Sequence, residues 1–184
     1  MIPPRTVKNV ISLRKWREKT FTDIFVFDID NTIFESVGTF ETDYDLDKFQ
    51  RDNTFFRNLF LRKLPLFYAI KNYYGKHNKL VVIQTARAKK WWLPIILFLK
   101  GVKYDILMQR PVSNNQSSCK LKRTQLVNLI LWRKINIGNV FFIDDDKQNR
   151  DSVGELQYAI TYDANKLNKT AIEKEIEAKI KRRF

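Results

Sequence analysis

The stretch FVFDIDNTIFES, residues 25–36, decides the interpretation of this 184-residue chain. An apolar run ends in Asp28, and Asp30 follows one residue later, directly before Asn31 and Thr32. A turn after a strand would account for one aspartate. Two carboxylates at the end of a buried strand indicate a metal site or a nucleophile instead. The rest of the chain has to distinguish these possibilities.

The composition indicates one folded, strongly basic domain. Apolar residues make up 44% of the chain and aromatic residues 14%, which excludes a disordered polypeptide. The 34 Lys and Arg residues outnumber the 20 Asp and Glu residues, so the net charge is +14. Such a charge favours contact with nucleic acid, an anionic membrane or a phosphorylated substrate. The alternative is a basic surface that is simply solvated.

The scarcity of cysteine and histidine disfavours several other kinds of chemistry. Cys119 is the only cysteine, so an intrachain disulfide is impossible, which suits a reducing cytosol. His77 is the only histidine, and thiol catalysis or a structural zinc site would need more partners. The N-terminus has no apolar signal core, and the longest apolar run, WWLPIILFL, is too short to span a membrane. We therefore expect a cytoplasmic protein without a membrane span.

Short apolar runs alternate with helical patterns along the chain. Strands are expected at 24–27, 80–83, 104–108, 140–143 and 158–162, and helices at 55–74 with a break at Pro65, 91–99 and 122–132. The alternation predicts an α/β fold, a Rossmann-like parallel sheet with helices on both faces.

The expected organisation has three parts. Residues 1–20 would form a basic arm or helix, residues 21–166 the core, and residues 167–184 a basic helix. Within the core, only residues 33–79 are available for a flap and a minimal cap, so a large lid is not expected.

Polar side chains follow four of the five expected strands, at the carboxyl ends where open α/β sheets bind their ligands. They are Asp28 and Asp30, then Thr85 and Arg87 on either side of Ala86, then Arg110 and a loop leading to Lys122 at a helix start, and finally Asp144, Asp145, Asp146 and Asn149. Clustered aspartates cannot all stay ionised without a cation. Oxygen ligands without His or Cys favour Mg²⁺.

Such a site suits phosphoryl transfer. One aspartate near the ion would attack phosphorus and form an aspartyl-phosphate. A second carboxylate two residues on would protonate the leaving oxygen and later activate water. A hydroxyl and a lysine would hold the remaining phosphoryl oxygens.

The ordered segments DIDNT (28–32), QTAR (84–87), Lys122 and IDDD (143–146) resemble the four motifs of the haloacid dehalogenase (HAD) superfamily of phosphohydrolases. The resemblance implies that Asp28 is the nucleophile and a metal ligand. It implies that Asp30 is the general acid/base, with its backbone carbonyl on the metal.

The same resemblance assigns the remaining positions. The substrate phosphate would be bound by Thr85, Ala86, Arg87 and Lys122, and Lys122 would also pair with Asp28. Asp145 would be the last protein ligand of Mg²⁺. Behind it, Asp144 and Asn149 would support the ligands or hold water, although many members have an acidic residue at the position of Asn149.

Residues 80–165, with the strand before Asp28, are similar to the 3′-phosphatase domain of the bacteriophage polynucleotide kinase–phosphatase. Lys122 precedes Trp132 by ten residues, as in that domain's motif. A kinase loop of the form G-x-x-x-x-G-K-[ST] does not occur. The resemblance implies nucleic-acid 3′-phosphate ends as substrate. Arg87 and Arg110 would grip a second phosphate and Trp91 would stack on a base, or all three would be ordinary surface or packing residues.

Three functions remain open at this stage. The first is a Mg²⁺-dependent phosphatase of nucleic-acid 3′ ends, consistent with an open site and a basic chain. The second is a phosphatase of mononucleotides or other small phosphomonoesters, with residues 35–52 as a selective flap. The third is a non-catalytic, basic nucleic-acid-binding module on the same fold. The sequence does not distinguish DNA from RNA or indicate an oligomeric state.

Overall fold

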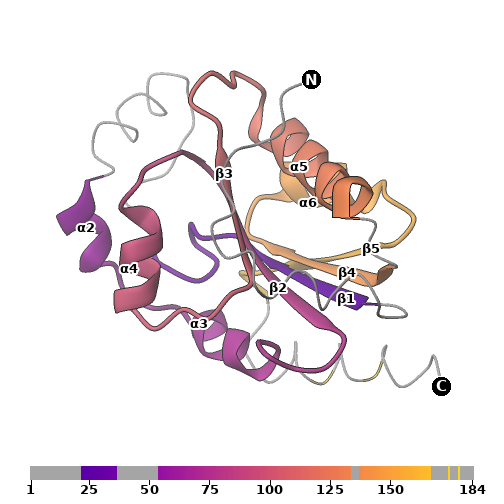
Figure 1. Cartoon of the computed structure of the whole chain (residues 1–184), viewed down its shortest axis with the longest axis horizontal. Coiled ribbons are helices and arrows are strands. Elements are labelled where there is room, and N and C mark those ends of the chain that lie inside the picture. Colours follow the sequence, from indigo (N-terminus) through magenta and orange to yellow (C-terminus); the bar gives the residue numbers. More distant parts are fainter. Residues whose placement is uncertain (1–21, 37–53, 134–136, 167–173, 175–177, 179–184) are drawn as a thin grey trace.

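One parallel sheet forms the centre of the computed structural model, which describes residues 22–36, 54–133, 137–166, 174 and 178 (Figure 1). The strand order is β3-β2-β1-β4-β5, and every neighbouring pair is parallel. The strands are β1 (Thr22–Phe27), β2 (Lys79–Ala88), β3 (Ile106–Arg110), β4 (Ile137–Asp144) and β5 (Ala159–Asp163). The order reverses at β1, which confirms the Rossmann-like α/β prediction and marks the usual place of a ligand site.

Helices cover both faces of the sheet, as Figure 1 shows. One face carries α2 (Phe55–Leu59), α3 (Pro65–Ala69), the 3₁₀ turn η2 (Ile70–Asn72) and α4 (Leu93–Leu99). The other face carries α5 (Ser118–Arg133) and α6 (Lys147–Gly154). The predicted helices on both faces are therefore confirmed.

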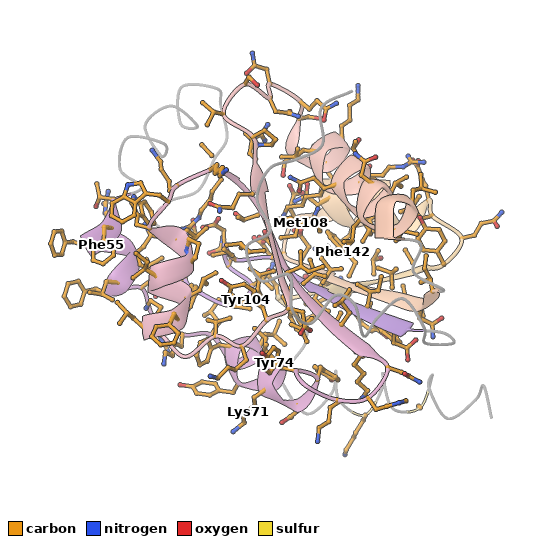
Figure 2. The ribbon with its side chains drawn as sticks, in the orientation of Figure 1. Phe55, Lys71, Tyr74, Tyr104, Met108 and Phe142 are labelled. Carbon is orange, nitrogen blue, oxygen red and sulfur yellow. The ribbon has the colours of Figure 1, made fainter. Side chains whose placement is uncertain are left out.

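Alternate residues of each inner strand enter two separate cores. Phe25 and Phe27 of β1 pack with α3 and α4, whereas Ile24 and Val26 pack with α5 and α6. Phe142 of β4 lies on the α5 side of the sheet (Figure 2). Because both faces are covered, the strands are apolar throughout, and this is why short continuous apolar runs located them in the sequence.

Several element boundaries differ from the prediction. The segment expected as one interrupted helix is broken into α2, α3 and η2, with Pro65 as the first residue of α3. Pairing with β3 extends β2 to Ala88, beyond its apolar run. The helix α5 begins at Ser118, so the expectation that Lys122 lies at a helix start is wrong by about one turn. Gly101, with φ of +79°, follows the C-cap residue Lys100 of α4, a position where glycine commonly ends a helix.

The short helix α6 was not anticipated. It begins at the acidic run, where Asp146 is the N-cap and its side chain accepts a hydrogen bond from the Gln148 N–H at 2.8 Å.

The predicted N-terminal arm, the C-terminal helix and most of the 35–52 flap lie outside the described residues. Among the residues that are described, no helix combines the length and apolarity needed to cross a membrane.

Candidate active site

Asp28 stands where β1 passes its last regular residue. Its N–H donates to the Ile143 carbonyl at 3.0 Å, which keeps the backbone aligned with β4. Ile29 is fully buried in the core, and its carbonyl accepts from the N–H groups of Ile33 and Phe34 in a tight turn. The carboxylates at 28 and 30 are thus fixed by a strand on one side and a turn on the other.

Three carboxylates meet beyond β1 and β4. One oxygen from each of Asp28, Asp144 and Asp145 lies within 4.8 Å of the others. Asp28 is 5% exposed and Asp144 is fully buried. Burial raises the pKa of Asp28 well above its usual value, and the negative charges of Asp144 and Asp30 raise it further, although Lys122 lowers it. Burial and the charge of Asp144 raise the pKa of Asp145 to about 6, against a hydrogen bond from Asn31 that lowers it.

The donor set fits a hard divalent cation, because all three side chains offer oxygen and the cluster carries excess negative charge. The side chain of Asp30 pairs with Arg87 instead of joining this group, whereas Asp144 is one of its three members. The supporting role expected for Asp144 therefore stays a prediction. Its position in the cluster also allows Asp144 to bind the cation directly.

Lys122 bridges two members of the acidic cluster. Its Nζ donates to Asp28 Oδ1 at 2.7 Å and to Asp144 Oδ2 at 2.6 Å, and its side chain is 2% exposed. Burial lowers the pKa of Lys122, but the two carboxylates outweigh this effect and raise the pKa above its usual value. Lys122 is therefore charged, and it neutralises only part of the cluster.

A chain of glutamines anchors the helix that carries Lys122. Gln84 Nε2 donates to the Lys122 carbonyl at 2.9 Å and to Gln125 Oε1 at 3.0 Å. Gln125 Nε2 donates in turn to the Gln109 carbonyl at 2.8 Å. These bonds tie α5 to β2 and β3, so they fix the height of Lys122 above the sheet. No local pattern in the sequence indicates this role of Gln84.

Asp30 faces Arg87 on the opposite side of β1. Arg87 Nε donates to Asp30 Oδ2 at 2.8 Å, and a second bond joins Nη2 to Oδ1. The remaining nitrogen, Nη1, donates to Asn58 Oδ1. Arg87 is 2% exposed. The planar guanidinium thus holds the carboxylate through two bonds while α2 holds the guanidinium. Sequence reasoning placed Arg87 at the substrate phosphate and missed both its pairing with Asp30 and the contribution of Asn58.

The other predicted phosphate-binding residues lie at the irregular end of β2. The register with β3 shifts between Gln84 and Ala88, so residues 85–87 leave the regular ladder. Thr85 is fully buried, and its Oγ1 accepts from the Arg87 N–H at 3.1 Å. The hydroxyl keeps its own proton to donate. Thr85 and Ala86 therefore sit beside Arg87, near the end of the strand.

The two predicted nucleic-acid contacts outside this segment differ in exposure. Arg110 Nε donates to the Ala86 carbonyl at 2.8 Å, and Nη1 donates to the Asn114 carbonyl at 3.1 Å, so the guanidinium organises the loop after β3. Trp91 is 79% exposed, whereas its neighbour Trp92 is 8% exposed and belongs to the core. Of the two, Trp91 has the greater surface to offer a ligand.

The acidic loop after β4 is held from α6. Asn149 Nδ2 donates to Asp144 Oδ1 at 3.2 Å and Oδ2 at 3.3 Å, which agrees with a supporting position. Arg150 Nη1 donates to the carbonyls of Asp144 at 2.9 Å and Asp145 at 2.6 Å. Its Nη2 pairs with Asp163 at the end of β5 at 3.0 Å. Sequence reasoning missed Arg150, although an arginine shortly after an acidic run on a helix was a usable signal.

Known proteins were compared with this chain by sequence and by fold. No family model matches the chain, and no curated protein matches it. Solved structures do match. One is a chain of the Pnkp1/Rnl/Hen1 complex, with a TM-score of 0.54 and 16% identity, covering 79% of this chain and 47% of that one. Another is the HAD domain of the effector protein Lem4 from Legionella pneumophila, with a TM-score of 0.57 and 12% identity, covering 86% and 93% of the two chains.

These similarities define the fold. The chain has the haloacid dehalogenase-like fold, as its motifs predicted. It spans about half the length of the chain that it resembles in the Pnkp1/Rnl/Hen1 complex and nearly all of the Lem4 domain.

Proposed function

We propose that this chain is a Mg²⁺-dependent phosphomonoesterase that acts on the 3′-phosphate ends of nucleic acids through an aspartyl-phosphate. The observation that carries the proposal is the cluster of Asp28, Asp144 and Asp145 around a buried lysine, at the switch point of the sheet. Excess buried negative charge is costly to a folded protein unless a cation offsets it, and a bound cation can then attract the anionic phosphoryl group.

Asp28 and Asp145 would hold the ion, together with the backbone carbonyl of Asp30, and Asp144 would bind it directly or support these ligands. When bound, Mg²⁺ supplies the positive charge that draws phosphoryl oxygens to the site and lets the carboxylates stay ionised. The other roles belong to the protein's own side chains.

Asp28 is the attacking group. A carboxylate oxygen of Asp28 forms a bond to phosphorus while the bond from phosphorus to the substrate oxygen breaks, and Asp30 gives that oxygen a proton. Asp30 then takes a proton from a water molecule, whose oxygen attacks phosphorus and releases Asp28 and inorganic phosphate. Lys122 holds Asp28 in place, and Lys122 and the Thr85 hydroxyl donate to the phosphoryl oxygens. Arg87 keeps the Asp30 carboxylate aimed at the leaving oxygen.

Two observations support a nucleic-acid substrate. The net charge of +14 favours a polyanion. A chain of similar fold, matched at a TM-score of 0.51 and 18% identity, is part of a complex described as the Pnkp1/Rnl/Hen1 RNA repair complex, and this chain covers 43% of it. A 3′-phosphate on a polynucleotide joins these two features in one substrate.

A substrate panel tests the proposal. Phosphate release is measured from oligonucleotides with a 3′- or a 5′-phosphate, from nucleoside monophosphates and from an aryl phosphate, each with Mg²⁺ and with EDTA. We expect Mg²⁺-dependent turnover and a preference for the 3′-phosphorylated oligonucleotide. A preference for mononucleotides would overturn the substrate. Equal release by wild type and Asp28→Asn would overturn the catalytic assignment.

A further inference from the structure

Large apolar side chains remain exposed on α2 and α4. We call them the α2–α4 surface: Phe56 and Phe60 at α2, Trp91 before α4, and Ile95, Phe98 and Leu99 on α4. Phe60 is 80% exposed and Phe98 75% exposed. The sequence LPIILFL of α4 is apolar on every side, although only its inner face is buried. Exposed apolar surface of this extent marks a binding site.

The α2–α4 surface adjoins the candidate active site. Asn58 of α2 is buried and accepts from Arg87, which holds Asp30. Phe55 packs edge-on against Trp92 with ring centroids 6.3 Å apart, and this contact joins α2 to α4. The two helices lie side by side at one flank of the sheet (Figure 1). The helix α2 therefore joins the two regions, because Asn58 contacts Arg87 while Phe56 and Phe60 are exposed on the same helix.

The part of the chain that forms the two helices and the strands after them is predominantly basic. The stretch 53–143, which contains both helices, has 17 Lys or Arg residues and a single acidic residue, Asp105. That residue faces inward, where its carboxylate accepts from the Val81 N–H at 2.8 Å. Arg57 of α2 and Lys89, two residues before Trp91, are exposed. Two copies of this chain would bring like charges together at this surface, which disfavours self-association. A polyanion is the complementary partner.

We infer that the α2–α4 surface binds the single-stranded nucleotides that precede the terminal 3′-phosphate. Bases stack on Phe56, Phe60, Trp91 and Phe98, and the phosphates between them meet Arg57, Lys89 and Lys90. Single strands are required because bases in a duplex stack on one another and leave no ring face for a side chain. This inference rests on the proposed function and adds where and in what form the polynucleotide is held.

The test compares two substrates on each variant. We measure kcat/KM for a 3′-phosphorylated single strand of about ten nucleotides, within the range that such surfaces cover, and for a 3′-nucleoside monophosphate. DNA and RNA strands are separate arms. We expect the kcat/KM for the strand divided by the kcat/KM for the monophosphate to be large in wild type. This ratio should fall roughly 10- to 100-fold in Trp91→Ala/Phe98→Ala, because stacked bases are lost. The control Leu131→Ala removes an exposed apolar side chain of α5, 66% exposed, and keeps the wild-type ratio.

The outcomes separate the inference from the function that it extends. No Mg²⁺-dependent release from any phosphomonoester would overturn the proposed function. Release with a wild-type ratio near one would overturn both the α2–α4 surface and the proposed preference for a polynucleotide. An unchanged ratio in Trp91→Ala/Phe98→Ala would overturn the α2–α4 surface alone. A preference for a fully paired 3′ end over a single strand would also overturn it. So would sedimentation showing a wild-type dimer that Phe98→Ala dissociates, because the surface would then join subunits.

Discussion

Asp28 and Asp30, the two aspartates of the DID segment, lie in different electrostatic environments. On the β4 side, Asp28 shares a buried corner with Asp144, Asp145 and a single Lys122, so negative charge is in excess. On the β2 side, Asp30 has one bidentate partner, Arg87, so charge is balanced. The first corner is suited to hold a cation and a phosphoryl group. The second is suited to hold one carboxylate in a fixed direction. Asp28 and Asp30 are separated by one residue, yet they acquire different chemistry because different strands lie beside them.

The largest effect should come from removing the attacking group. Asp28→Asn keeps the shape of the side chain but lacks a nucleophilic carboxylate, and we expect kcat to fall roughly 1,000-fold or more. Steady-state kinetics on the 3′-phosphorylated oligonucleotide measure it. Asp30→Asn provides the contrast, because it should slow the oligonucleotide far more than an aryl phosphate, whose good leaving group needs little proton donation. Equal losses on both substrates would argue against the acid/base role of Asp30.

The next effect concerns stability. Lys122→Met leaves Asp28 and Asp144 buried without their cation, and we expect the metal-free protein to lose about 3–5 kcal/mol of unfolding free energy. Urea denaturation measures the loss. Adding Asp144→Asn should restore part of it, because one of the two orphaned charges is removed. A loss below about 1 kcal/mol, the range of a surface pair, would contradict this buried bridge.

Arg87→Lys should weaken only the Asp30 side of the site, where Arg87 holds the Asp30 carboxylate. An ammonium group cannot reproduce the two parallel bonds to Asp30 together with the bond to Asn58. We expect kcat to fall roughly 10- to 100-fold through misplacement of the acid/base, with Mg²⁺ affinity by calorimetry close to that of wild type. Asn58→Ala should show a smaller loss of the same kind. If Mg²⁺ affinity falls as steeply as kcat, the Arg87–Asp30 pair and the cluster around Asp28 do not act independently.

The smallest effect is a pH dependence of stability. The pKa of Asp145 is raised to about 6, chiefly by burial, so the folded metal-free protein binds this proton more tightly than the unfolded chain. The resulting stability is present below roughly pH 4, the ordinary pKa of an aspartate. It is lost as the pH rises through the pKa of Asp145 in the folded protein. Mg²⁺ requires the ionised form, so its stabilising effect should grow over the same interval.

Melting temperatures between pH 4 and 7, with and without Mg²⁺, measure this dependence. Asp145→Asn should melt higher than wild type in the absence of metal at neutral pH, and it should gain less from Mg²⁺. The same gain from Mg²⁺ in both proteins would remove Asp145 from the metal site.

The sequence located what depends on local pattern. Buried strands are continuous apolar runs, so the sheet could be predicted. The ordered set of four motifs located Asp28 and its partner Lys122, although not the place of Lys122 within α5. The partners of the motif residues could not. Asn58 reaches Arg87 across 29 residues and Gln84 reaches Lys122 across 38, and neither pairing leaves a periodic trace. The short α6 was missed because its cap, Asp146, was read as part of the acidic run.

The central claim is that Asp28 carries the phosphoryl group in a Mg²⁺-dependent reaction. Acid quenching of the protein during turnover of a 3′-phosphorylated oligonucleotide, followed by peptide mass spectrometry, tests it most directly. We predict one phosphoryl group on the peptide containing Asp28 in the presence of Mg²⁺, and none with EDTA or in Asp28→Asn. A phosphoryl group on another residue, or undiminished turnover in Asp28→Asn, would contradict the account.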